Sequence, residues 1–179
     1  MKIKNFNFKR VNSTNKTAIR IIKKNKLDYG MITSELQEKG KGQHGKKWIS
    51  YKGNLFLSFF FNIDKIKIPI KKVTKINCLL VKKLISQFYK KEIIFKSPND
   101  LLIKKRKICG ILQEIIVNNN KKYLIIGIGL NVIKSPKIKN YPTTNLLELT
   151  KKNLNTKHLA NRIKLIFEKN FSKYYRVVI

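Results

Sequence analysis

The apolar positions of this chain form one nearly unbroken run and two periodic stripes. The run, residues 55–61, is apolar at nearly every position, which is typical of a strand that a sheet buries on both faces. Apolar residues at steps of three and four predict amphipathic helices over residues 71–90 and 156–174. The pattern therefore predicts a central buried strand with at least two helices packed nearby.

A third helix is predicted near the N-terminus. The polar residues 12–15 offer side-chain oxygens that can cap a helix running to about Lys26, with Ser13 or Thr14 as the N-cap. The free N–H groups and hydroxyls at such a helix start also form a surface that binds a small anionic or ureido-like group. The spacing alone is compatible with both a simple cap and a binding site.

Shorter alternating or apolar segments predict the remaining strands. They lie at residues 3–9, at 31–34, at 48–50, at 92–96, in a hairpin of 101–103 and 107–117, and at 123–130. Successive strands joined by short turns make an antiparallel meander, and 3–9 is expected to be an edge strand. No repeat, linker or low-complexity tail divides the 179 residues, so we expect one domain.

A glycine-rich loop precedes the central strand. Its sequence is Gly40-Lys41-Gly42-Gln43-His44-Gly45-Lys46-Lys47-Trp48. Glycine permits positive φ and close approach of a ligand to the backbone, and the lysines bring positive charge to the same short segment. We interpret the loop as a mobile segment that holds an anion; a solvated turn is the alternative, and Trp48 is alternatively a core anchor.

Two further local patterns are a pair of glycines within a strand and an ordinary turn after a proline. Gly127 and Gly129 lie within a predicted strand, which indicates that something, such as a ligand ring, comes close to the backbone there. Pro98 ends the strand before it, and Asn99 and Asp100 follow in a predicted turn.

The charge of the chain is strongly positive. Lys and Arg number 41 against nine Asp and Glu, for a formal net charge of +32. This favours a polyanionic partner. However, the lysines are spread over nearly every segment, as a compositional bias of the genome also produces. We find no helix-turn-helix, zinc-finger or RNA-recognition signature.

Cysteine usage and hydropathy bear on location. Cys78 and Cys109 lack the spacing of a metal site, and so do the two histidines. No signal peptide or segment of transmembrane length is present in the sequence. We therefore predict a cytoplasmic protein that does not associate with membranes.

Taken together, the motifs give the chain a resemblance to a known family. They are Asn12-Ser13-Thr14-Asn15 with Gln37, the Gly40 to Trp48 loop, Lys96-Ser97-Pro98-Asn99-Asp100, Arg106-Lys107-Ile108-Cys109-Gly110-Ile111-Leu112-Gln113-Glu114, and Gly127-Ile128-Gly129-Leu130-Asn131. In order and spacing they resemble the catalytic domain of biotin protein ligases. The match covers nearly the whole chain.

The resemblance implies an α+β fold, with a mixed, mostly antiparallel sheet flanked by helices, related to class II aminoacyl-tRNA synthetases and lipoate ligases. It also implies an ATP-dependent, AMP-forming ligase. Biotin and ATP, as substrates, give biotinyl-5′-AMP and pyrophosphate, and a lysine of a biotin carboxyl carrier protein then attacks the adenylate. Mg²⁺ is expected with ATP, although no metal-ligating residue is predicted.

The resemblance also assigns roles to individual residues. Those implied to hold the ureido end of biotin are Ser13, Thr14, Asn15 and Gln37. The rest of the biotin site is implied to contain Gly40, Lys41, Gly42, Gln43, Gly110 and Gly127. Lys107 is the implied catalytic residue, which contacts the carboxylate and stabilises charge as the acyl phosphate forms. The ATP or adenylate site is implied to contain Lys41, Lys46, Trp48, Asn99, Asp100, Gly129 and Asn131.

The sequence departs from the family pattern in two places. Family members usually carry arginines in the glycine loop, where this chain has Lys41, Gln43, His44 and Lys46. Gln43 loses the charge, so we expect faster leakage of the adenylate. Ser97 replaces the usual tryptophan before Pro98, which removes a packing group.

Residues 1–179 are expected to be a single catalytic domain, without the N-terminal DNA-binding domain and the C-terminal SH3-like barrel often seen in the family. The expected partner is the carrier protein, no DNA is expected, and the chain is expected to be a monomer or homodimer. Two alternatives stay open. A lipoate or octanoate ligase shares the fold and chemistry, and a basic nucleic-acid-binding module predicts salt-sensitive binding without dependence on biotin.

Overall fold

A computed structural model describes residues 2–25, 27–64 and 69–175 of the chain. The strands are β1 (Lys4–Val11), β2 (Tyr29–Gln37), β3 (Leu55–Asn62), β4 (Ile94–Lys96), β5 (Asp100–Ile103), β6 (Arg106–Asn118) and β7 (Lys121–Leu130). The helices are α1 (Thr14–Lys24), α2 (Ile70–Ile85), α3 (Leu146–Thr150) and α4 (Thr156–Tyr175), with a short 3-10 helix, η1, at Gln43–Gly45.

The seven strands form one sheet in the order β1-β2-β3-β7-β6-β5-β4. β1 pairs with β2 in parallel, and the other neighbouring strands pair in antiparallel register. The predicted α+β class with a mixed, mostly antiparallel sheet is confirmed. The apolar run lies in β3 and is buried at every position from Leu55 to Phe61. β1 is an edge strand, as the sequence predicted.

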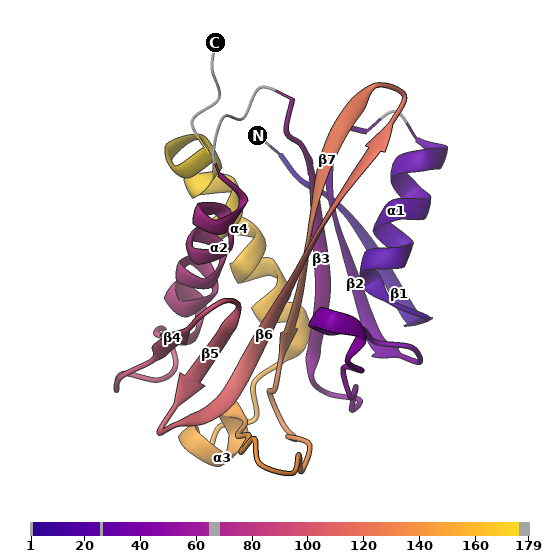
Figure 1. Ribbon diagram of the computed structural model, residues 1–179. Helices are drawn as coiled ribbons and strands as arrows, with labels where there is room; N and C mark the ends of the chain where they lie inside the picture. Colours follow the sequence, from indigo (N-terminus) through magenta and orange to yellow (C-terminus); the bar gives the residue numbers. More distant parts are fainter. Residues whose placement is uncertain (1, 26, 65–68, 176–179) are drawn as a thin grey trace.

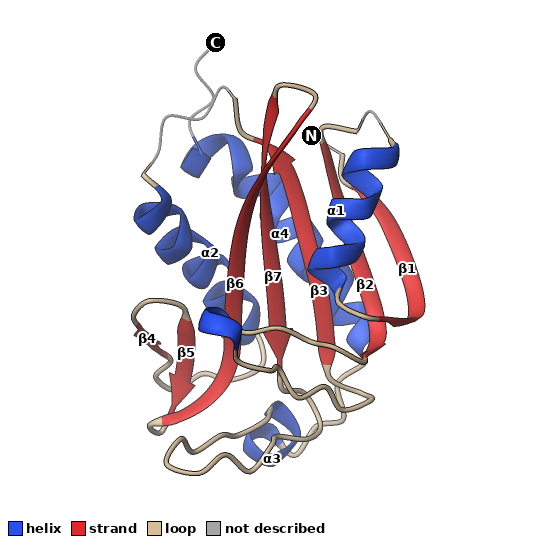
Figure 2. Cartoon of the chain, turned by 45° about the vertical axis from the view of Figure 1, so that its right-hand side comes forward, coloured by secondary structure: helices blue, strands red, loops and turns tan. Residues whose placement is uncertain are grey.

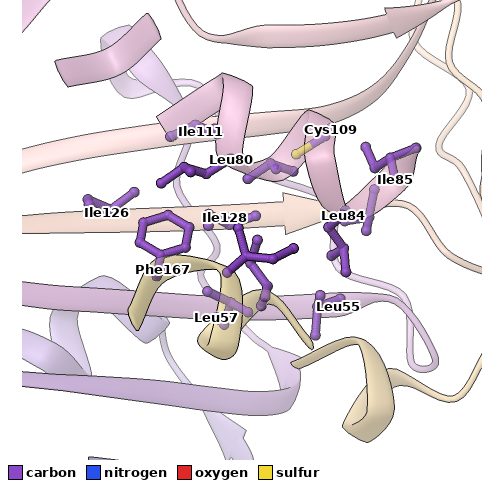
Figure 3. Close-up of a cluster of buried hydrophobic side chains, with 14 of the residues drawn as sticks. Leu55, Leu57, Leu80, Leu84, Ile85, Cys109, Ile111, Ile126, Ile128 and Phe167 are labelled. Atoms are coloured by element: carbon purple, nitrogen blue, oxygen red, sulfur yellow. The ribbon is translucent and has the colours of Figure 1, made fainter. Parts of the chain in front are cut away.

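The sheet divides the molecule into layers (Figure 1). α2 and α4 cover one face, and α1 covers part of the other. The larger core lies beneath α2 and α4, where Leu80 and Leu84 of α2 and Phe167 of α4 pack beside strand residues such as Leu57 (Figure 3). Phe59 stacks on Phe167 with ring centroids 4.2 Å apart. This packing holds the sheet in place, and the sheet in turn positions the residues on its other face.

Strand alternation decides which residues occupy the α1 face, because successive side chains of a strand point to opposite faces. In β7, Ile126 and Ile128 join the larger core, whereas Tyr123 and Ile125 pack in the cluster under α1. Gly127 and Gly129 continue the second set. On this face β7 therefore carries no side chains at Gly127 and Gly129, where the strand extends past α1.

Two sequence predictions need correction, and one short helix was missed. Residues 48–50 form no strand, because the chain there leaves the glycine loop as irregular backbone. α2 ends at Ile85 and not at residue 90, since Ser86, Gln87 and Phe88 turn and donate their N–H groups back to the last turn. The short helix α3 was not predicted. Asn145 caps it by accepting the Glu148 N–H at 2.8 Å.

Smaller differences concern element ends. α1 ends at Lys24, and Lys26 lies outside the described residues. The predicted strand at 92–96 is shorter in the structure, where β4 begins at Ile94. The turns at Lys104 and Lys105 and at Asn119 and Asn120 place all four residues at positive φ, as tight hairpins require.

No helix in the described part of the chain combines the length and hydropathy needed to cross a lipid bilayer.

Candidate active site

A pocket of about 870 Å³ lies on the α1 face of the sheet. The loop that follows β2 crosses in front of the sheet at this place (Figure 2). The pocket is lined by all but one of the predicted site residues: Ser13, Thr14, Asn15, Gln37, Lys41, Gly42, Gln43, Lys46, Trp48, Asn99, Asp100, Lys107, Gly110, Gly127, Gly129 and Asn131. Segments far apart in the sequence thus meet in one place. Gly40 is not among the lining residues.

Amide and hydroxyl groups form one end of the pocket, at the start of α1. The Gln37 side-chain carbonyl accepts hydrogen bonds from the Thr14 backbone N–H at 2.9 Å and from the Thr14 hydroxyl at 3.1 Å. Ser13 is the N-cap by position, but its side chain makes no capping bond. The free N–H of the helix start is therefore satisfied by Gln37 from β2, which ties the strand end to the helix.

Ser58 and Glu114 complete this polar end, and sequence reasoning gave neither a role. The Ser58 hydroxyl is fully buried and lies 2.7 Å from the Thr14 hydroxyl, and it also hydrogen-bonds to the Asn15 side-chain carbonyl. Asn15 Nδ2 donates to Glu114 Oε2 at 2.6 Å. Ser58 is the one polar residue in the apolar run of β3, and that exception was the available signal. These bonds fix the Asn15 amide flat against the sheet.

The glycines of β6 and β7 form the floor of the pocket. Gly110 and Gly129 are opposite each other in the sheet. A Cβ at Gly129 would lie 2.4 Å from the Trp48 indole, and one at Gly127 would lie 2.4 Å from Asn15 Oδ1. The close approach predicted at these glycines is real, but in this structure the approaching groups are side chains of the chain itself.

The glycine loop is a small hairpin in this structure. Backbone bonds from Gly42 N to Lys46 O at 2.7 Å and from Trp48 N to Gly40 O at 3.0 Å close it. Of its glycines only Gly45 uses the positive φ that glycine permits, at 74°. Gly40 is needed for another reason, because a Cβ there would lie 2.6 Å from the Trp48 carbonyl oxygen.

Lys107 lies on β6 in an ion pair with Asp100 of β5, with Nζ 2.9 Å from Oδ1. The Tyr141 hydroxyl donates to Asp100 Oδ2 at 2.6 Å. Burial raises the pKa of Tyr141 well above its usual value, and the hydrogen bond to Asp100 and the negative charge of Asp100 raise it further. Lys107 Nζ also lies 5.3 Å from the Trp48 ring centroid. The cation is thus held between a carboxylate and aromatic faces, partly shielded from water.

Two asparagines predicted beside the nucleotide also hold the backbone. Asn99 Nδ2 donates to the Ile111 carbonyl at 2.7 Å, which pins the turn before β5 to β6. Asn131 Nδ2 donates to the Thr144 carbonyl at 3.1 Å. Its Oδ1 and the indole Nε1 of Trp48 are both buried without a hydrogen-bond partner. Both residues line the pocket, and a buried polar atom without a partner is unusual in a folded protein.

The charge of the pocket is strongly positive. Its lining includes the lysines Lys41, Lys46, Lys47, Lys96, Lys107 and Lys139. Asp100 is the one acidic residue among the lining residues of the described chain. Such an arrangement attracts a polyanion and lowers the repulsion between a carboxylate and a triphosphate.

Known proteins share this architecture. The chain is 27% identical to the bifunctional ligase/repressor BirA of Bacillus subtilis over 175 residues, covering 92% of this chain and 52% of that protein. It is 26% identical over 130 residues to the biotin–[acetyl-CoA-carboxylase] ligase of Mycobacterium tuberculosis, covering 69% and 47%. The chain therefore spans about half the length of these curated relatives.

Solved structures give the same result. The biotin protein ligase from Aquifex aeolicus in complex with biotin and ATP superposes with a TM-score of 0.81 at 27% identity, covering 97% of this chain and 72% of that one. The Leishmania major enzyme in complex with biotinyl-5-AMP has a TM-score of 0.81 at 21% identity, covering 98% and 81%, which shows the shared fold. Residues 7–131, more than half of the chain, match the Biotin/lipoate A/B protein ligase family, and the chain belongs to that family.

Proposed function

We propose that this chain attaches biotin to a lysine of a biotin carboxyl carrier protein by way of biotinyl-5′-AMP. The observation that carries the proposal is the pocket itself, which joins a neutral amide and hydroxyl end to several lysines, Lys107 among them. Biotin has matching parts, a ureido ring and a carboxylate. The relatives named for biotin ligation, and the Aquifex aeolicus complex with biotin and ATP, support the choice of biotin within the family.

The first step joins two anions. A carboxylate oxygen of biotin attacks the α-phosphorus of ATP, the bond to the β-phosphate oxygen breaks, and pyrophosphate leaves with its electron pair. Cations near the reacting oxygens stabilise the charge that accumulates there. In this proposal Lys107 contacts the carboxylate, and the lysines of the glycine loop contact the phosphates. Trp48 and Asn131, which also line the pocket, are proposed to lie beside the adenine.

The second step transfers the acyl group. The amine of the carrier lysine attacks the acyl carbon, an amide bond forms, and AMP leaves as the amine loses a proton. The mixed anhydride is prone to hydrolysis, so the glycine loop acts as a cover that excludes water until the carrier arrives. The net charge of +32 suits an acidic carrier surface, which is the partner class we propose.

Mg²⁺ belongs to the proposal as a companion of ATP. In the described part of the chain no group of three or more His, Cys, Asp and Glu side chains lies close enough together to hold a metal ion. Mg²⁺ usually keeps several waters and binds substrate phosphates with one or two carboxylates. The pocket fits such an ion if the phosphates of ATP supply most of its ligands, and it would neutralise part of their charge.

Two buried and free cysteines agree with the proposed location in the cytoplasm. Burial, with a contribution from the nearby Asp100, raises the pKa of Cys78 to about 12, so this thiol stays protonated. A protonated thiol is a poor nucleophile, which keeps both cysteines out of the proposed chemistry.

The test is biotin-dependent exchange of labelled pyrophosphate into ATP by the purified chain. We expect exchange that requires biotin and that falls by roughly 100-fold or more in Lys107→Ala, the scale of removing one charge-stabilising group. Lys122→Ala, an exposed lysine at the opposite end of β7 from Gly129, is the matched control and should keep full activity.

Each rival activity has its own outcome in the same preparation. If lipoate or octanoate supports exchange and biotin does not, the substrate is that acid, and the adenylation chemistry stays as proposed. No exchange with any of the three acids, together with nucleic-acid binding that weakens steeply with salt, would overturn the proposal in favour of a binding module.

A further inference from the structure

Tyr141 has a contact with the proposed catalytic group that no motif of the sequence points to. We propose that Tyr141 is a positioning residue, which holds Asp100 so that Lys107 remains available to the carboxylate of the acid substrate. The inference rests on the proposed function of this pocket. It concerns a residue in the loop between β7 and α3, outside all of the motifs that carry the family resemblance.

The two oxygens of Asp100 have different partners. Lys107 Nζ lies 2.9 Å from Oδ1, and the Tyr141 hydroxyl lies 2.6 Å from Oδ2. Asp100 is only 9% exposed, so water does not readily replace either partner. Because the Tyr141 hydroxyl occupies Oδ2 with a hydrogen bond, the ammonium is left the ion pair with Oδ1, which has no hydrogen-bond partner in the described part of the chain.

The backbone fixes the place of Tyr141 independently of its hydroxyl. Lys107 N donates to the Pro142 carbonyl at 2.8 Å, and Thr144 N donates to the Lys107 carbonyl at 2.9 Å. The segment after Tyr141 therefore runs alongside β6 next to the lysine. The ring itself lies 4.4 Å from Lys96 Nζ and 5.6 Å from Lys107 Nζ. A phenylalanine at this position keeps the backbone pairing and the ring contacts and loses only the hydroxyl.

Loss of the hydroxyl has a predictable consequence for Lys107. Asp100 Oδ2 would become a buried acceptor without a partner, which costs free energy until another donor fills the place. The nearest cation is the Lys107 ammonium, which would shift to share both oxygens. An ammonium drawn to Asp100 has less to offer an incoming carboxylate. Tyr141 thus acts through Asp100 and does not itself touch the reacting atoms.

The test compares an acid with its neutral ester. Binding of biotin and of biotin methyl ester is measured by calorimetry for the unmodified chain, Tyr141→Phe and Tyr51→Phe. In Tyr141→Phe we expect biotin to bind roughly tenfold more weakly, the scale of one hydrogen bond to a charged group, while the ester is unaffected. Tyr51→Phe is the matched control, because its ring also lies near an ammonium, 4.8 Å from Lys134 Nζ, but outside the pocket.

The outcomes separate this inference from the proposed function. Equal weakening of acid and ester would indicate a general disturbance of the pocket, and unchanged binding of both would indicate no role for the hydroxyl; either result overturns the inference. Pyrophosphate exchange by the unmodified chain tests the proposed function separately from the role of Tyr141. A chain that neither exchanges nor binds biotin would remove the proposed function, and the inference with it.

Discussion

The indole of Trp48 rests on the bare backbone of Gly129, so closely that a Cβ at position 129 would lie 2.4 Å from the ring. The glycine is therefore required by a side chain of the same protein, and the ring in turn covers the floor of the pocket. This contact links the glycine loop to β7. A single methyl group added at position 129 would therefore displace the loop, although the two segments are far apart in the sequence.

Gly129→Ala should displace the Trp48 indole. We expect the free energy of unfolding to fall by about 1–3 kcal/mol, the usual cost of overpacking a filled site, and the KM for ATP in the exchange assay to rise. Chemical denaturation measures the first effect. The stability cost should nearly vanish when the same change is made in a Trp48→Ala background, because the clash partner is then absent. An equal cost in both backgrounds would mean that the indole is not what the methyl group meets.

Gln43→Arg should slow the escape of biotinyl-AMP. Gln43 stands in the glycine loop at a place where the family resemblance led us to expect an arginine, and it offers neither a charge nor a planar fork of donors to the adenylate phosphate. We expect the release rate to fall by roughly tenfold, the scale of one charge-assisted hydrogen bond. Dilution of the preformed adenylate with a trap gives the rate. Gln43→Lys restores charge alone and should have a smaller effect; unchanged rates in both variants would rule the idea out.

Asn54→Ala should be among the more destabilising single changes. The Asn54 side-chain carbonyl accepts the N–H groups of Val132, Ile133 and Lys134 at 2.9, 3.0 and 3.2 Å. Its Nδ2 donates to the Lys134 carbonyl at 2.7 Å, and the residue is 2% exposed. Leaving several buried groups unpaired is expected to cost about 3 kcal/mol of unfolding free energy. Asn54→Asp keeps the acceptor and loses only the donor, so it should cost clearly less in the same denaturant titration.

The sequence predicted the structure best where the same residues determine both the strand pattern and the lining of the pocket. The period of two in β7 places Gly127 and Gly129 on the pocket face, and the apolar run identifies β3 as central. The helix α3, which Asn145 caps, was not predicted because its five residues are too few to show a helical period. Tyr141 was not predicted because it lies in an irregular loop, where side chains follow neither the helical period nor the strand period. The end of α2 was misplaced since Phe88 continues the apolar stripe after the backbone has turned. Contacts such as that of Tyr141 with Asp100 depend on tertiary packing, which no local pattern encodes.

Glu148→Gln should change how stability depends on acid. The hydrogen bond from Arg106, 2.5 Å from Glu148 Oε1, lowers the pKa of this carboxyl below its ordinary value of 4.5. A lowered pKa in the folded state means that the stabilisation is present above about pH 4.5 and is lost as the pH falls through the folded-state value.

The expected size of this effect is less than about 1 kcal/mol, because the Glu148 side chain is 42% exposed and water screens the pair. Unfolding free energies of the unmodified chain and of Glu148→Gln should therefore differ at pH 7 and converge as the pH falls below 4. Glu35→Gln, which changes an exposed glutamate of β2, is the control and should show no such convergence. A difference between the unmodified chain and Glu148→Gln that stays constant from pH 7 to strong acid would show that Glu148 stabilises α3 through its shape and not through its charge.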